Sequence, residues 1–127
     1  MQDNDFDLNK ISEIIINCAF QVANTLGSGF LEKVYENAMV IELTKRGLSV
    51  NQQHSLKVYY DNKVVGDYFA DIIVNNEIIV ELKTVNSINE IHEAQLLNYL
   101  KASNKKLGLI INFYTPKVQI KRMVNNI

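Results

Sequence analysis

Three charged residues interrupt two apolar stretches of this sequence. Asp71 lies in the stretch 68–74, and Glu81 and Lys83 lie in the stretch 78–83. Both stretches are rich in β-branched residues and flank a short polar segment, which is the pattern of a β-hairpin buried inside a sheet. Ionised side chains in a central strand are costly unless they are paired or bind a metal. Their placement therefore indicates a functional site.

Whether the three side chains meet depends on the loop between the two strands. Glu81 and Lys83 share one face of their strand, because side chains alternate with a period of two. A two-residue turn would set Asp71 opposite Val80 and place it on the other face. A three-residue loop, 75–77, sets Asp71 opposite Glu81, and residues paired in this way share a face. We predict this loop, or another of odd length.

In that register Asp71 and Glu81 present two carboxylates within about 5 Å of each other, and these repel. A hard divalent cation such as Mg²⁺ relieves the repulsion because it prefers oxygen ligands. Lys83, on the same face, can polarise a water molecule or neutralise charge that develops on a phosphate. The set therefore suits metal-assisted hydrolysis of phosphodiesters.

Helices and strands must position these groups, and apolar periodicity predicts both. The expected order is helix 8–26, helix 30–46, strand 49–60, strand 64–74, strand 78–83, helix 87–102 and strand 106–113. The three consecutive strands form an antiparallel meander. The strand–helix–strand unit that follows brings the next strand parallel to a neighbour. The fold class is therefore α/β, a mixed sheet flanked by helices, in one domain over 1–127.

Several polar residues are expected to mark the ends of these elements. Asp7 is the predicted N-cap of the first helix, and Ser87 with Glu90 forms the predicted capping box of the third. Thr115-Pro116 is expected to break the last apolar strand. The segment 117–124 then forms either a short final strand or a helical tail.

The composition is that of an ordinary soluble globular protein, with 47% hydrophobic and 21% charged residues. The acidic first five residues lack the basic region of a signal peptide, and no apolar run is long enough to span a bilayer. A cytoplasmic location without membrane association is the expectation. The single cysteine, Cys18, lies in an apolar helical pattern and is expected in the core.

The charge distribution is uneven, although the net charge is only −1. After Glu93 there is no acidic residue, whereas six basic residues follow: Lys101, Lys105, Lys106, Lys117, Lys121 and Arg122. A basic end beside an acidic centre fits a phosphate-binding rim around a metal site. An ordinary solvated face fits the same pattern equally well.

Two motifs resemble those of a known group of enzymes. Asp71, followed after a hairpin by Glu-Leu-Lys at 81–83, resembles the signature of the PD-(D/E)XK nuclease superfamily, and the order of elements resembles its restriction-endonuclease-like core. The stretch 29–35, Gly-Phe-Leu-Glu-Lys-Val-Tyr, matches the Gly-x-x-Glu-x-x-Tyr motif of one branch, the GxxExxY proteins. The resemblance covers about 11–113. Ala70 stands before Asp71 where the signature has proline, at a position that is loose in the superfamily.

The resemblance implies roles for individual residues. Asp71 and Glu81 would bind the metal, Mg²⁺ or Mn²⁺, and Lys83 would assist the attacking water. Glu32, on a helix that flanks the sheet, resembles the additional acid that many members contribute to catalysis.

Gln95 and Tyr99 resemble the Gln-x-x-x-Tyr positions that support the site in exonuclease-like members, so Gln95 joins the catalytic candidates. Ordinary helix–sheet packing explains both residues equally well. For Gly29 and Tyr35, a glycine at a helix start and a packed aromatic are the stronger interpretation.

The function implied is a metal-dependent nuclease that hydrolyses nucleic-acid phosphodiester bonds, with DNA favoured over RNA. A homodimer is compatible with a domain too small to grip both strands of a duplex extensively. The alternative is a non-catalytic nuclease-fold module that binds nucleic acid or a protein partner. The near-neutral charge favours the module, and the intact set of two acids and a lysine favours the enzyme.

Overall fold

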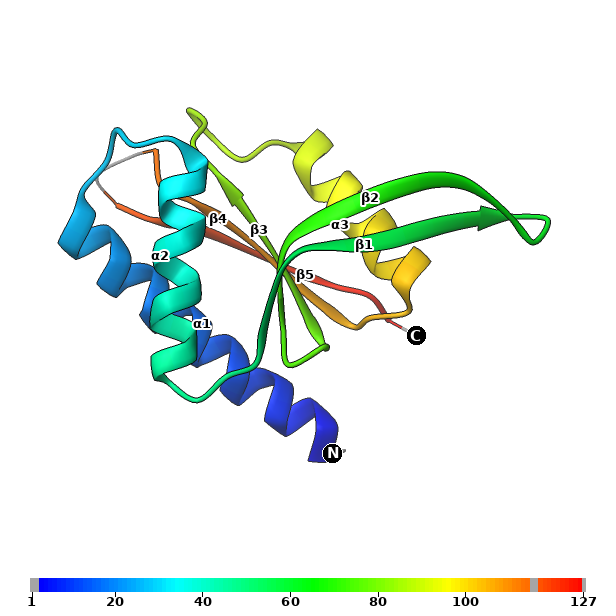
Figure 1. Cartoon of the computed structure of the whole chain (residues 1–127), viewed down its shortest axis with the longest axis horizontal. Helices are drawn as coiled ribbons and strands as arrows, with labels where there is room; N and C mark the ends of the chain where they lie inside the picture. Colours follow the sequence, from blue (N-terminus) through cyan, green and yellow to red (C-terminus); the bar gives the residue numbers. More distant parts are fainter. Residues whose placement is uncertain (1–2, 115–116, 127) are drawn as a thin grey trace.

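The computed structural model describes residues 3–114 and 117–126 (Figure 1). Its elements are α1 (Asp3–Leu26), α2 (Glu32–Lys45), β1 (Val50–Tyr60), β2 (Lys63–Val74), β3 (Ile78–Lys83), α3 (Glu90–Ser103), β4 (Leu107–Asn112) and β5 (Gln119–Val124). The predicted order of helices and strands is confirmed, and the segment after β4 is a strand. The expected break at Thr115-Pro116 lies outside the described residues.

The strands form one mixed sheet in the order β1-β2-β3-β4-β5. Strands β1, β2 and β3 are an antiparallel meander, β4 lies parallel to β3 after the crossover through α3, and β5 returns antiparallel to β4. The predicted fold class is therefore confirmed, with a fifth strand added at the far edge.

Helices cover both faces of the sheet, and each face has its own core (Figure 1). On one face α1 and α2 pack on side chains that include Val80 and Leu82, and Cys18 is buried there as expected. On the other face α3 packs on side chains that include Ile73 and Ile79. This alternation along β2 and β3 follows from the period of two in a strand buried on both sides.

Strands β1 and β2 are about twice as long as β3, with 11 and 12 residues against 6. Their outer halves extend beyond the sheet as a two-stranded arm, drawn in green in Figure 1. At the base of the arm Leu56 and Ala70 are buried in the same core as α3. The arm therefore joins the sheet where β2 passes between the two helical layers.

The predicted capping box at Ser87 and Glu90 is wrong. Helix α3 begins at Glu90 and its N-cap is Asn89, whose Oδ1 accepts from the backbone N–H of His92 at 3.1 Å. In return, Nδ1 of His92 accepts from the N–H of Asn89 at 3.3 Å. The sequence Asn-x-x-His offers the same reciprocal bonding as Ser-x-x-Glu, and the extended backbone at Asn89 selects it.

The predicted N-cap at Asp7 is also wrong, because α1 begins at Asp3 and Asp7 lies inside it. No glycine or proline precedes Asp7, so nothing in the sequence breaks the helix there. In the described residues no helix is both long and apolar enough to cross a membrane.

Candidate active site

The β2–β3 hairpin has the predicted three-residue loop. Val74 pairs with Ile78, so the loop is 75–77, and the ladder continues with Ile72 opposite Val80. One step further along the same register, Asp71 faces Glu81. The register prediction is confirmed.

Two asparagines allow this loop to turn so tightly. Asn75 and Asn76 have φ angles of 52° and 56°, in the left-handed region that asparagine tolerates better than most residues. The side-chain Oδ1 of Asn75 accepts from the N–H of Ser49, and the Asn75 N–H donates to the Ser49 carbonyl, both at 2.8 Å. The loop is thus tied to the segment before β1, which holds its length.

Beyond Ile72 the two carboxylates bond to the backbone of the neighbouring strands. The N–H of Asp71 donates to Oε2 of Glu81 at 3.0 Å, and the N–H of Leu82 donates to Oδ2 of Asp71 at 2.8 Å. One oxygen of each carboxylate is therefore held by the backbone. Asp71 Oδ1 and Glu81 Oε1 stay outside this pairing.

Burial and mutual repulsion make both carboxylates harder to ionise. Burial, reinforced by the negative charge of Asp71, raises the pKa of Glu81 to about 7. Burial also raises the pKa of Asp71, and the charge of Glu36 adds to this rise. The positive charge of Lys83 acts in the opposite direction on both pKa values, so its ammonium group lies within electrostatic reach of the pair. Extra positive charge at this site would be stabilising.

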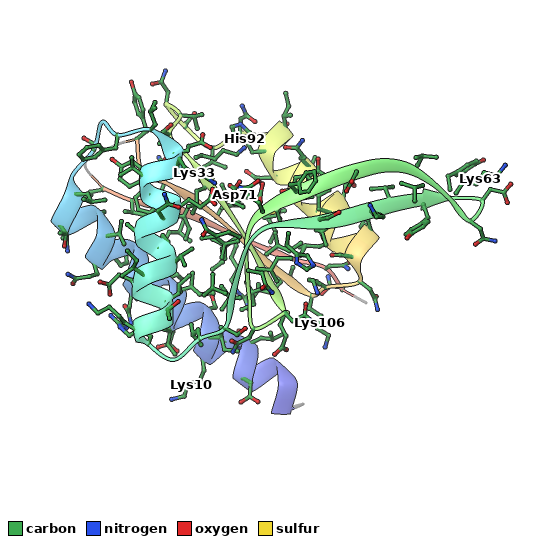
Figure 2. The ribbon with its side chains drawn as sticks, in the orientation of Figure 1. Lys10, Lys33, Lys63, Asp71, His92 and Lys106 are labelled. Carbon is green, nitrogen blue, oxygen red and sulfur yellow. The ribbon has the colours of Figure 1, made fainter. Side chains whose placement is uncertain are left out.

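Helix α2 brings a carboxylate toward the site, and this carboxylate is Glu36, not the predicted Glu32. Glu36 is only 4% exposed and accepts hydrogen bonds from Lys33 Nζ at 3.0 Å, Gln52 Nε2 at 2.8 Å and Gln53 Nε2 at 3.1 Å. The predicted acid, Glu32, is exposed in the first turn of α2, and no described hydrogen bond or ion pair joins it to the site. In the view of Figure 2, Asp71 appears just below Lys33 on α2 and His92 at the start of α3.

A sequence signal for Glu36 exists in retrospect. The buried side of α2 is defined by Tyr35, Met39 and Leu43, and Glu36 is the acidic residue buried with them. A lone acid on an apolar helix face needs partners, by the same argument that singles out the charges in β2 and β3.

The two residues expected from α3 differ in their placement. Gln95 is exposed, and no described hydrogen bond joins it to the carboxylates. Tyr99 stacks on Tyr68 of β2, with ring centroids 3.3 Å apart and ring planes 10° from parallel. Burial, and then the charge of Glu81, raise the pKa of the Tyr68 hydroxyl, so this ring lies against the site. Tyr99 thus reaches the site through Tyr68, a residue that sequence patterns did not single out.

A family model described as the PD-(D/E)XK nuclease superfamily matches residues 9–123. The chain belongs to this superfamily. The crystal structure of a protein named SSO0001 is similar with a TM-score of 0.56 and 17% identity, a likeness that shows the fold alone. The match covers 94% of this chain and 60% of that chain. No curated protein is significantly similar in sequence.

PD-(D/E)XK nucleases generally use divalent metal ions, and the donor set of this member fits one. Asp71 and Glu81 offer oxygen ligands only, and the repulsion between them calls for a cation. In the part of the chain that is described, no three side chains of His, Cys, Asp or Glu come together closely enough to bind a metal. Two carboxylates suit Mg²⁺, which keeps several water ligands and is completed by substrate phosphates.

The Gly-x-x-Glu-x-x-Tyr motif at 29–35 has a local structural role. Tyr35 is fully buried, stacks on Phe113 at 4.5 Å, and its hydroxyl donates to the Gly27 carbonyl at 2.6 Å. Gly29 has a φ of +107°, a conformation that favours glycine. Both residues shape the loop that leads into α2 and so place the helix that carries Glu36.

The basic residues of the C-terminal part are divided between the two faces. Lys121 lies two strands from Glu81 and is 3.7 Å from Glu93 of α3. Lys106 and Arg122 line a pocket of about 400 Å³ next to α1, where Arg122 donates to Asn9 at 2.7 Å. Of these three basic side chains, Lys121 therefore lies beside α3, and Lys106 and Arg122 lie on the α1 side of the molecule.

Proposed function

We propose that this PD-(D/E)XK protein is a metal-dependent nuclease that hydrolyses phosphodiester bonds in nucleic acid. The observation that carries the proposal is the register of β2 and β3, which sets Asp71 opposite Glu81 and puts Lys83 two residues further along the same strand. Their pKa shifts support it, because a buried pair of like charges is stabilised by a cation.

Each residue has a proposed role in the reaction. Asp71 and Glu81 hold the cation, Mg²⁺ or Mn²⁺, through the oxygens that the backbone does not bind. When bound, the cation would activate water and neutralise phosphate charge. Lys83 orients the attacking water and offsets developing charge. Glu32 and Gln95 remain candidates for supporting roles, which rest on the family resemblance.

Four finer statements also belong to the proposal. DNA is favoured over RNA as the substrate, a homodimer is compatible with the small size of the domain, and the location is the cytoplasm. The motif at 29–35 supports membership of the GxxExxY branch.

The test compares cleavage of double-stranded DNA, single-stranded DNA and RNA with Mg²⁺, with Mn²⁺ and with a chelator. We expect Asp71→Asn, Glu81→Gln and Lys83→Met each to lower the cleavage rate about a hundredfold or more. Asp67→Asn is the matched control, since Asp67 lies on the same strand but is exposed and bonds to Ser55 and Lys57.

Two outcomes would contradict the proposal. Cleavage that persists in all three site variants would point to another site or to a contaminating enzyme. Metal binding without cleavage of any of the three substrates would favour the non-catalytic binding module.

A further inference from the structure

Gln53 has an unusual backbone for its place in the chain. Its φ angle is 49°, in the left-handed region, although it lies inside strand β1. The other described non-glycine residues with positive φ are aspartate or asparagine residues in turns: Asp61, Asn62, Asn75, Asn76 and Asn104. Strained backbone of this kind persists where the surrounding structure enforces it, and it is often found at functional sites.

The strained residue stands directly beside the site. In the β1–β2 ladder Gln52 pairs with Ile72 and His54 pairs with Ala70, so Gln53 falls at the position opposite Asp71. Its left-handed backbone interrupts the regular pairing there. As a result, the side chains of the successive residues Gln52 and Gln53 both reach Glu36, although successive side chains of a regular strand point to opposite faces.

The amide of Gln53 contacts two carboxylates that come from different elements. Its Nε2 is 3.1 Å from Oε1 of Glu36 on α2 and 3.5 Å from Oδ1 of Asp71 on β2. The two hydrogens of one NH₂ group can serve both acceptors. The other oxygen of Asp71 is held by the N–H of Leu82, so the amide contacts the oxygen that a cation would use.

We propose that Gln53 is a positioning residue that holds Asp71 beside Glu36, and that its amide competes with a divalent cation for Oδ1 of Asp71. The inference rests on the proposed function, because it assigns Asp71 to the metal. The amide hydrogens offset part of the repulsion between the two carboxylates. A cation would offset this repulsion more strongly. The amide hydrogen and the cation compete for the same side of Oδ1 of Asp71.

Loss of the amide should therefore strengthen cation binding for two reasons that act in the same direction. It removes a group that competes for Asp71, and it leaves the charges of Asp71 and Glu36 less compensated. The same loss should weaken the cation-free protein, in which the two carboxylates would then repel without the amide between them.

The decisive variant is Gln53→Gly, because glycine adopts a positive φ without strain and only the side chain is lost. We expect calorimetric titration with Mn²⁺ to show about three- to tenfold tighter binding than in the unmodified protein. Saturating Mn²⁺ should raise the melting temperature of the variant by more than it raises that of the unmodified protein. Gln53→Asn, which tolerates the backbone but is too short to reach both carboxylates, should behave in the same way.

Gln52→Ala is the matched control. Gln52 Nε2 donates to Glu36 at 2.8 Å and to Asn37 at 3.0 Å, and Gln52 sits in the regular ladder opposite Ile72, so its loss spares Asp71. Because Gln52→Ala also removes a donor to Glu36, its Mn²⁺ affinity should rise, but by less than in Gln53→Gly and by no more than about twofold. Equal or weaker binding by Gln53→Gly would overturn this inference alone. No Mn²⁺ binding by the unmodified protein would overturn the proposed metal dependence and this inference with it.

Discussion

The ionised forms of the two carboxylates at this site are unfavourable without a cation, because the side chains are buried and close together. Asp71 and Glu81 are paired across two strands, each accepts a backbone N–H, and burial raises both of their pKa values. Such a pair costs stability when both members are ionised, and a ligand that binds only the folded state recovers that stability. Two predictions follow at the scale of single residues.

The stability of the metal-free protein should fall as the pH rises from about 4.5 to about 7. The folded protein retains the proton of Glu81 up to a pKa of about 7, whereas the unfolded chain releases it near 4.5. The unfolded state thus binds fewer protons in this window, and the free energy of unfolding drops by on the order of 3 kcal/mol. Denaturant unfolding at several pH values in a chelator measures this slope.

Glu81→Gln should remove that slope and make the metal-free protein more stable at pH 8. Asp67→Asn, an exposed carboxylate on β2, should leave the slope unchanged. An identical slope in Glu81→Gln would mean that another group releases the proton.

Two substitutions on α2 test whether Glu36 or Glu32 contributes to cation binding. Glu36→Gln keeps the shape of the side chain but removes the negative charge that acts on Asp71. We expect Mn²⁺ affinity to fall about threefold or more, because the cation loses a nearby charge. Glu32→Gln is the matched variant four residues earlier and should bind Mn²⁺ like the unmodified protein. A larger loss in Glu32→Gln would instead support the role that the family resemblance implies.

At the scale of elements, the loop 75–77 and the start of α3 both depend on asparagine, for different reasons. In the loop, Asn75 and Asn76 adopt left-handed backbone and so set the register of the hairpin. At α3, the side chain of Asn89 accepts a backbone N–H that the helix leaves without an internal partner. The N-cap of α3 therefore lies two residues after the predicted cap, Ser87.

Removal of the N-cap should destabilise the protein measurably. Asn89→Ala should lower the free energy of unfolding by about 1 kcal/mol, since the His92 N–H loses its acceptor. Ser87→Ala is the control from the capping box that sequence predicted, and it should have almost no effect. Thermal unfolding of the two variants decides between the caps, and a larger effect of Ser87→Ala would contradict the observed helix start.

For the whole molecule, the site depends on two helical layers being held close to one sheet. Helix α2 brings Glu36 from one side, and α3 brings Tyr99 from the other. On the α3 side the packing is tight at Gly108 of β4, where an added Cβ would lie 2.9 Å from Leu96 Cδ2. The small residue allows α3 to approach the sheet.

Filling this space should push α3 away from the sheet. Gly108→Ala should cost about 1–3 kcal/mol, because Leu96 is 1% exposed and has little room to move. Gly66→Ala in the arm is the matched control, since its Cβ would meet Val58 at an ordinary 3.7 Å. Denaturant unfolding measures both. Equal effects of the two substitutions would show that the close approach at Gly108 is not limiting.

Local patterns in the sequence were enough to predict the order of elements and the β2–β3 register. Alternation places Glu81 and Lys83 on one face, and the length of a short loop decides which residue Asp71 meets. These features depend on neighbours within a few residues, so they can be read along the chain. The predicted helix starts at Asp7 and Ser87 were wrong. For α3 the reason is that Ser87 and Asn89 are both good caps and only the path of the chain selects one.

The tertiary structure alone decided which distant residues complete the site. Glu36 and Gln53 reach Asp71 because α2 packs beside β1 and because Gln53 has a left-handed backbone. Side chains from separate elements meet through packing over the whole sheet, and no periodicity within one element encodes that meeting. The β2–β3 hairpin pairs the two carboxylates. The tertiary fold determines which side chains surround them and therefore how readily they ionise.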